Sequence, residues 1–257
     1  MKAPIVEQKD ITNCPTCGST VRILRRANGY ADHYEAENIH LAKIELKTQD
    51  QETASKLHEL RKGKKTVAFV GMSTTSCGLA PYKDKGVEIW SLNQAHAFPW
   101  MKRADRWFQI HTSKLWDKEV VKRDVHGHND WLRENPWNIP IYMQYWRDDV
   151  PNSVAYPLRE VCNTFFKNMR RGDAKVKYFT STIAYMFGVA LLEKFERIEI
   201  YGTEMAAGTE FGEQKACAEF WIGQALGRGV EIYLPPSCLL MYSDLYGGNE
   251  QGEGWLE

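Results

Sequence analysis

Short apolar segments alternate with longer amphipathic segments over most of the chain, beginning near residue 66. Six short segments read as buried strands, because they are continuous apolar or β-branched runs bounded by turn residues. They cover residues 66–70, 87–92, 106–110, 139–145, 197–202 and 230–235. Such runs are typical of a mostly parallel sheet with helices on both faces, so the pattern predicts an α/β fold.

Three helices are predicted between these strands. The segment 181–195 is apolar nearly all round, begins at the candidate N-cap Ser181, and carries Gly188 where another backbone can approach closely. A second helical pattern covers residues 213–229 and ends in glycines suited to a C-cap, and a third covers 158–169. The alternation of strands and helices predicts a Rossmann-like architecture.

The first 65 residues follow a different pattern. Residues 11–35 read as a small hairpin, with Cys14 and Cys17 in a turn, a strand over 19–26 and a reversal at 27–29. An apolar stripe predicts a helix over 37–58. The charged segment 61–65 reads as a linker. We therefore predict a small N-terminal unit over residues 1–65, with a zinc-knuckle-like hairpin and a helix, and a Rossmann-like nucleotide-binding domain over 66–257.

Composition narrows the class of protein. Hydrophobic residues make up 43% of the chain, which suits a globular core, and Lys+Arg and Asp+Glu balance at 33 each. No global positive field therefore draws the protein to nucleic acid. The first residues lack the apolar core of a signal peptide and no apolar run approaches a membrane span, so we expect a cytoplasmic protein that makes no membrane contact. The cysteines, six in number, are then expected as thiols or metal ligands.

A turn rich in small residues follows the first strand of the main domain. In an open α/β sheet, ligands bind beyond the carboxyl ends of the strands, where small residues let backbone N–H groups and hydroxyls approach phosphate. The turn lacks the glycine-rich signatures of NAD sites and of ATP-hydrolysing P-loops. A plain strand-to-helix turn explains it equally well. The candidate nucleotide ligands are Gly71, Ser73, Thr74, Thr75 and Ser76.

Polar residues also follow three other strands. Asn93 and Gln94 follow the second strand, where their amides can recognise a base or a ribose, although Asn is also a common turn residue. His111 follows the third strand and is a candidate base, with a structural role as the alternative. Gly202 and Glu204 follow the fifth strand, where the carboxylate can bind a ribose hydroxyl, act as a base or cap the next element.

The starts of two helices complete the predicted site. Ser181 and Thr182 open the apolar helix with hydroxyls, unpaired N–H groups and the positive end of the helix dipole. Glu210 and Gln214 lie four residues apart, a spacing that places them on one face of the next helix. We predict that Gln214 contributes to the nucleotide site and Glu210 to catalysis.

This ordered set of motifs resembles bacterial sialyltransferases of the lipooligosaccharide type and related Rossmann-like proteins, including archaeal 6-hydroxymethylpterin diphosphokinases. It is also similar to uncharacterised phage-encoded proteins. The resemblance covers about residues 66–240 and implies that Gly71, Ser73, Thr75 and Asn93 line a donor-nucleotide site, with Ser181 and Thr182 at its helix start. The turn departs from the Gly-x-Gly-Pro-Ser of the sialyltransferases, and their catalytic histidine and phosphate-binding tyrosines have no matched positions.

A cysteine pair in the N-terminal unit suggests a metal site. Cys14 and Cys17 have the spacing of a zinc knuckle, and His33 and His40 follow at a looser spacing than in a standard finger. A degenerate knuckle without metal is the alternative. If zinc binds there, nearby arginines can contact the phosphates of DNA, namely Arg22, Arg25 and Arg26.

Together these patterns predict a transferase that uses a nucleotide-activated donor, namely a glycosyltransferase, and the phage resemblance extends this to an enzyme acting on DNA bases in the host cytoplasm. His111, Glu204 or Glu210 would remove a proton from the acceptor hydroxyl, a role worth about 10²–10⁴-fold in rate. Two alternatives stay open. One is a nucleotide-binding protein without catalysis, and the other is a partner-binding protein whose Rossmann-like site is empty.

Overall fold

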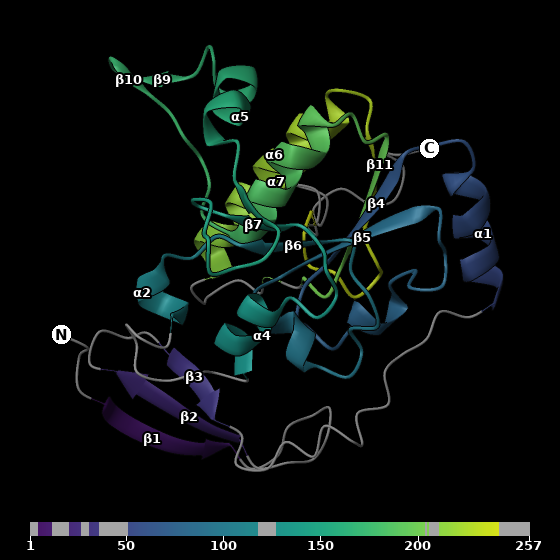
Figure 1. The fold of residues 1–257 in the computed structure, drawn as a ribbon. Coiled ribbons are helices and arrows are strands. Elements are labelled where there is room, and N and C mark those ends of the chain that lie inside the picture. Colours follow the sequence, from purple (N-terminus) through teal and green to yellow (C-terminus); the bar gives the residue numbers. More distant parts are fainter. Residues whose placement is uncertain are drawn as a thin grey trace, which may run out of the picture.

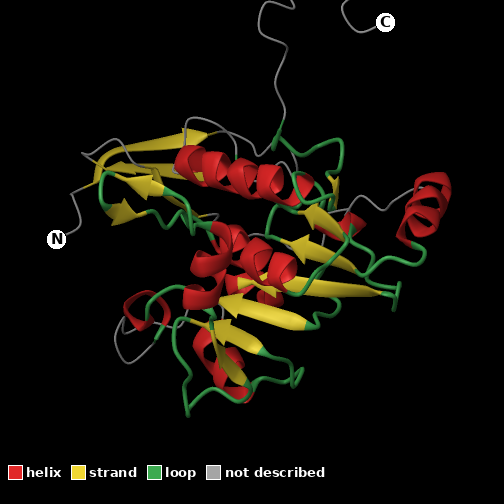
Figure 2. Cartoon of the chain, turned by 90° about the horizontal axis from the view of Figure 1, so that it is seen from above, coloured by secondary structure: helices red, strands yellow, loops and turns green. Residues whose placement is uncertain are grey.

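The computed structural model describes residues 51–117, 127–203, 205 and 211–241, together with the backbone of 5–11, 21–26 and 31–35. Its main feature is a seven-stranded sheet in the order β12-β11-β4-β5-β6-β7-β8, in which every neighbouring pair is parallel. The strands lie side by side in one twisted array (Figure 2). They are β4 (Thr66–Val70), β5 (Val87–Leu92), β6 (Arg106–Gln109), β7 (Ile141–Met143), β8 (Ser153–Ala155), β11 (Arg197–Tyr201) and β12 (Glu231–Tyr233).

The predicted parallel α/β sheet is confirmed, with one strand more than the sequence indicated. All six predicted strands form, while β8 is short and lies between two prolines, so its apolar pattern is too brief to read. From β4 the chain adds strands outward to β8, and then crosses to β11 on the other side of β4. The strand order therefore reverses between β4 and β11, which makes this the switch point of the sheet.

Helices α6 (Thr182–Leu192) and α7 (Phe211–Leu226) cover one face of the sheet (Figure 1). Aromatic side chains of the sheet pack directly on this layer, since Phe69 meets Phe187 edge to face with ring centroids 5.1 Å apart. Helix α5 (Leu158–Phe165) packs on α6. The helix predicted over 158–169 thus ends early, and the chain continues into a hairpin of β9 (Arg170–Arg171) and β10 (Ala174–Lys175).

The other face is covered by short helices and large aromatic side chains. The short helices of this layer are η2 (Cys77–Leu79), η3 (Asn93–Ala97) and α4 (His128–Glu134). A further short helix, α2 (Ser113–Trp116), follows β6. Trp100 and Trp107 are almost fully buried in this layer, and Trp131 packs on Trp107 with centroids 4.7 Å apart. Indole rings therefore fill much of the volume that longer helices occupy on the first face.

Helix α1 (Gln51–Arg61) is joined to the sheet by a buried ionic network. Arg61 forms two hydrogen bonds with Glu199 of β11, at 2.9 and 2.7 Å, and Arg197 and Tyr201 each add one at 2.8 Å. Although burial alone would raise the pKa of Glu199, these donors hold it below its ordinary value. Arg61, expected in a linker, is thus a helical residue that contacts the core sheet.

The N-terminal strands form an antiparallel sheet of β1 (Ile5–Ile11), β2 (Val21–Arg26) and β3 (Ala31–Glu35). The predicted pairing of two strands across a reversal is confirmed, and β1 was not predicted. The domain boundary near residue 65 stays a prediction. Within the described ranges, no helix has the length and apolar character needed to cross a membrane.

Candidate functional site

The predicted nucleotide ligands follow the carboxyl ends of β4, β5 and β11 or lie at the starts of α6 and α7. Because all strands of the sheet are parallel, these ends meet at one edge, and helices that precede strands begin at the same edge. The described members are Gly71, Ser73, Thr74, Thr75, Ser76, Asn93, Gln94, Ser181, Thr182, Gly202 and Gln214. The candidate catalytic residues Glu204 and Glu210 lie outside the described residues, so His111 alone can be placed.

At the switch point, the turns after β4 and β11 pack against each other. The Gly71 N–H donates to the Tyr201 carbonyl at 2.8 Å, and the Ser73 N–H donates to the Gly202 carbonyl at 2.9 Å. The Gly202 N–H donates in turn to Ser76 Oγ at 2.7 Å. A Cβ on Gly71 would lie 2.3 Å from the Gly202 oxygen, and Gly202 has a φ of +64°. These contacts require small residues at the switch point whether or not a ligand is bound.

The remaining hydroxyls of this turn reach the surface. Ser73 Oγ and Thr75 Oγ1 share a hydrogen bond of 3.0 Å, Thr74 is half-buried and Thr75 is exposed. After the turn the chain forms only the single turn η2, so no long helix directs its dipole at this point. Phosphate binding by these residues stays a prediction.

Three buried polar atoms near the ends of β5 and β6 and at the start of α6 have no hydrogen-bond partner among the described residues. They are Asn93 Oδ1, Gln109 Nε2 and Ser181 Oγ. Asn93 has a φ of +49°, and Ser181 occupies the N-cap position of α6 without capping it through its side chain. Leaving such a group unpaired costs about 1–3 kcal/mol. The oxygen of Asn93 can therefore accept, the nitrogen of Gln109 can donate, and the hydroxyl of Ser181 can do either toward a ligand.

A histidine pair holds Gln109 in place. Nε2 of His128 lies 3.0 Å from Gln109 Oε1, and Nδ1 of His128 lies 2.9 Å from His96 Nε2. The His96 ring stacks on Trp131 with centroids 4.4 Å apart. Burial, together with the neighbouring His96 and His111, lowers the pKa of His128 to about 3. His128 is therefore a neutral positioning group for Gln109.

His111 lies two residues beyond β6 and is exposed at the same edge. The protein around the ring removes part of its water and lowers its pKa below the ordinary value. A neutral imidazole is the form that accepts a proton, so this environment suits a general base. Its catalytic role stays a prediction.

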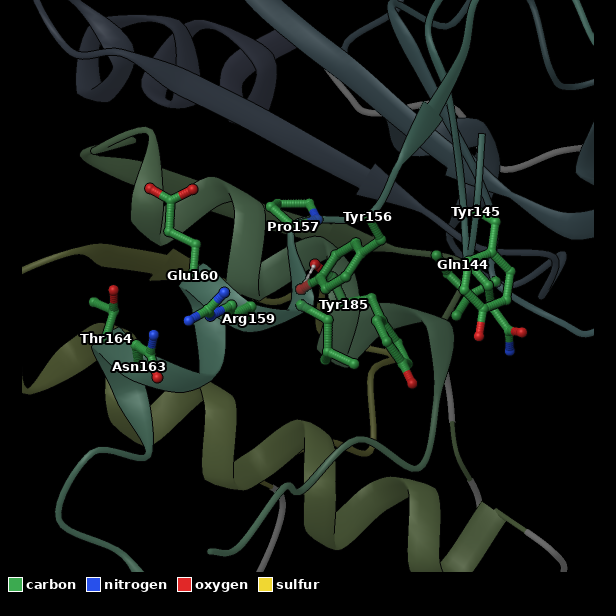
Figure 3. Close-up of a pocket in the computed structure, with 11 residues that line it drawn as sticks. Gln144, Tyr145, Tyr156, Pro157, Arg159, Glu160, Asn163, Thr164 and Tyr185 are labelled. Atoms are coloured by element: carbon green, nitrogen blue, oxygen red, sulfur yellow. Dashed lines mark hydrogen bonds between the residues drawn. The ribbon is translucent and has the colours of Figure 1, made fainter. Parts of the chain in front are cut away.

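A cavity of about 850 Å³ opens beyond the ends of β6, β7 and β8, between these strands and helices α5 and α6 (Figure 3). Tyr156 and Tyr185 lie together in its middle, with Gln144 and Tyr145 at one end and Asn163 at the other (Figure 3). Cavities of this size hold ligands as large as a nucleotide.

Close packing on α6 fixes the wall of this cavity. Tyr156 Oη donates to the Tyr185 carbonyl at 3.1 Å. A Cβ on Gly188 would lie 2.4 Å from that hydroxyl and 2.8 Å from a methyl of Val161. The expected close approach to Gly188 is thus made by the side chains of Tyr156, directly after β8, and of Val161 in α5, rather than by another backbone.

Arg159 supplies a cation to the cavity. It is exposed and forms no ion pair with another described residue. By contrast, Arg106, Arg147 and Arg197 each bind a carboxylate within 3 Å. A guanidinium in this state is available to an anionic ligand, for which its paired donors are well suited.

Sequence reasoning missed Gln109 and the cavity. A glutamine in the otherwise apolar run RWFQI was a usable signal for Gln109. The cavity had no such signal, because Gln144, Tyr156 and Tyr185 come from three separate segments of the chain. Among described residues, no cluster of three or more His, Cys, Asp or Glu can hold a metal ion. Cys14, Cys17 and His40 lie outside the described residues, as does the side chain of His33.

Comparison with known proteins finds similar solved structures at low identity. No protein-family model matches the chain, and no curated protein sequence matches it. The sialyltransferase CstII from Campylobacter jejuni, solved with the substrate analogue CMP-3FNeuAc, is 12% identical with a TM-score of 0.45, covering 68% of this chain and 82% of that one. The same enzyme with cytidine-5'-monophosphate is 14% identical with a TM-score of 0.41, over the same shares. The enzyme with a trisaccharide acceptor and CMP is 10% identical with a TM-score of 0.39, covering 66% and 80%.

Proposed function

We propose that this protein is a transferase that uses a nucleotide-activated donor, namely a glycosyltransferase. One observation carries the proposal. At the carboxyl edge of a parallel sheet, Asn93 Oδ1, Gln109 Nε2 and Ser181 Oγ are buried and have no partner among the described residues, and a cavity of about 850 Å³ is lined by tyrosines and by Arg159, which forms no ion pair within the same ranges. Aromatic rings, amides and a guanidinium are the groups that a base, a ribose and a diester or diphosphate need.

Each of these groups has a proposed role. Asn93 and Gln94 bind the base or ribose, since an amide both donates and accepts. Ser181 and Thr182, at the positive end of α6, bind phosphate together with Arg159. A second set contributes weaker polar contacts at the margin of the site, namely Gly71, Ser73, Thr74, Thr75, Ser76, Gly202 and Gln214.

The proposed reaction is a displacement at the sugar carbon of the donor. A base removes the proton from the acceptor hydroxyl, whose oxygen forms the new bond to that carbon. The bond from the carbon to the donor phosphate breaks, and the phosphate leaves with the electron pair. We propose His111 as the base, with Glu204 and Glu210 as the other candidates.

Two finer proposals concern the N-terminal unit. We propose that Cys14 and Cys17 bind zinc, with His33 and His40 as candidate partners, and that this region contacts DNA if the acceptor is a DNA base of a phage or its host. Metal analysis of the purified protein tests the first proposal. Zinc at one equivalent, lost in Cys14→Ser, would support it, and metal-free protein would exclude it.

Thermal-shift measurements with a panel of nucleotides and nucleotide sugars test the main proposal. CMP and CMP-3FNeuAc, which are bound in the solved sialyltransferase structures, belong in that panel. A ligand at 100 times its dissociation constant should stabilise the protein by about 2.7 kcal/mol. If no ligand raises the melting temperature, the proposal fails.

Turnover separates the proposal from a binding protein without catalysis. With a ligand in hand, release of the nucleotide from its sugar is measured with and without candidate acceptors. In the proposed enzyme, His111→Ala lowers the rate by about 10²–10⁴-fold and leaves nucleotide affinity nearly unchanged. Nucleotide binding without any release would instead establish the non-catalytic alternative.

A further inference from the structure

A basic β-ribbon projects from the fold next to the cavity. Residues 167–177, here called the basic ribbon, contain the antiparallel pair β9 and β10, with Arg170 opposite Lys175. Gly172 and Asp173 form the two-residue turn at its tip. Figure 1 shows this hairpin extending away from the sheet beyond α5.

The segment from α5 through this ribbon carries a cluster of positive charges. The full chain is neutral, with 33 basic and 33 acidic residues, yet residues 159–177 hold six basic and two acidic ones. All six are exposed, and none forms an ion pair with another residue in the described ranges. They are Arg159, Lys167, Arg170, Arg171, Lys175 and Lys177. Unneutralised charges gathered in this way create a local positive field.

This charged surface is continuous with the mouth of the cavity. A second depression of about 390 Å³ lies under the ribbon and is lined by Lys167, Lys175 and Lys177. Asn163 of α5 lines both this depression and the larger cavity. A polyanion on the ribbon would therefore lie beside the proposed transfer site.

We propose that the basic ribbon binds the phosphate backbone of a nucleic-acid duplex. A two-stranded ribbon is narrow enough to enter a major groove about 12 Å wide. Arginine and lysine side chains on both of its faces can contact phosphates on the two groove walls. The tip carries Gly172 and Asp173, so it has no apolar side chain to insert into a bilayer. This inference does not rest on the proposed transferase activity, since it concerns binding without a donor.

Fluorescence anisotropy with a short labelled DNA duplex tests the inference on the full chain without nucleotide. The variant Arg170→Gln/Arg171→Gln/Lys175→Gln removes three charges from the ribbon. The matched control Lys83→Gln/Lys85→Gln/Lys102→Gln removes three charges from exposed lysines elsewhere. We expect the ribbon variant to bind roughly tenfold more weakly or worse, and its slope of log K against log salt to flatten by about 2 to 3. The control should keep wild-type affinity and slope.

Several outcomes would overturn the inference. Equal losses in both variants, or no salt-dependent binding by the wild type, would show that the ribbon has no particular role. Tighter binding to vesicles rich in phosphatidylserine than to the duplex would assign the surface to membranes. Loss of duplex binding only in Arg22→Gln/Arg25→Gln/Arg26→Gln would move the contact to the N-terminal strands. Melting curves of all variants confirm that each is folded.

Discussion

At the switch point between β4 and β11, the turns that contain Gly71 and Gly202 are in close backbone contact; we call this the packed region. Beyond β6, β7 and β8, by contrast, tyrosines line a cavity of about 850 Å³, which we call the open region. Both regions lie at the carboxyl edge of one parallel sheet. Gly71 and Gly202 are small because the chain meets itself there. Tyr156, by contrast, packs against Gly188 on one side and lines the cavity. Small residues at a strand end thus indicate close packing as readily as a ligand, while binding volume forms where larger side chains hold elements apart.

The largest expected effect comes from filling the packed region. Gly202→Ala puts a Cβ 2.8 Å from the Gly71 oxygen at a φ of +64°. Because strain and overlap add, the free energy of unfolding in urea should fall by about 3 kcal/mol. The control Gly223→Ala lies inside α7 with no atom within 4 Å of its Cβ, and should gain about 0.5–1 kcal/mol. Equal stability of the two variants would contradict the packing role of Gly202.

His128, which positions Gln109, should make the free energy of unfolding depend on pH. The pKa of His128 is about 3 in the folded protein and 6.5 ordinarily, so the unfolded chain takes up this proton first as pH falls. The free energy of unfolding is therefore at its full value above about pH 6.5 and decreases toward pH 3 as the unfolded chain is protonated. Between pH 7 and pH 5 this decrease amounts to about 2 kcal/mol. Unfolding at both pH values should show this difference shrink in His128→Gln. It should persist in His58→Gln, which changes an exposed histidine.

The cation of the open region is tested by Arg159→Gln. If Arg159 binds donor phosphate, its loss should weaken nucleotide binding by about 2 kcal/mol, or roughly 30-fold, in titration calorimetry. The free energy of unfolding should change by less than about 0.5 kcal/mol, because the side chain is exposed. Lys83→Gln, which removes an exposed charge away from the cavity, serves as the control. An affinity loss shared by both variants would indicate only a general charge effect.

The smallest expected effects come from removing one serine hydroxyl in each region. Ser181 Oγ is buried and has no partner in the described part of the chain, so Ser181→Ala should leave the free energy of unfolding unchanged or raise it. Its loss should weaken nucleotide binding by about 1 kcal/mol. Ser76 Oγ accepts the Gly202 N–H, so Ser76→Ala should cost about 1–3 kcal/mol of stability. The reverse pattern would exchange the roles assigned to the two regions.

The sequence was informative about the sheet and less so about what covers it. Continuous apolar runs such as 66–70 and 87–92 predicted β4 and β5 with their observed bounds, because buried parallel strands have few other sequence patterns. Periodicity could not show that η2 follows β4 in place of a longer helix, since Trp100 and Trp107 fill that face through tertiary contacts.

In the candidate site, too, some residues could be predicted from the sequence and the cavity could not. Asn93 and Ser181 were predicted from their places at a strand end and a helix start, and each has a buried polar atom with no partner among the residues that the structure describes. The cavity depends on packing between segments far apart in the chain, as in the contact of Tyr156 with Gly188. Single-sequence patterns do not encode such contacts.

Hydrogen exchange with and without a bound nucleotide tests most directly whether the donor occupies the cavity. The ligand is the compound with the largest thermal shift, held at saturating concentration. We expect slower exchange in peptides covering residues 156–164, which line the cavity, and 181–186, which begin α6. Slower exchange confined to residues 71–76 and 202–203, with the cavity peptides unchanged, would contradict it.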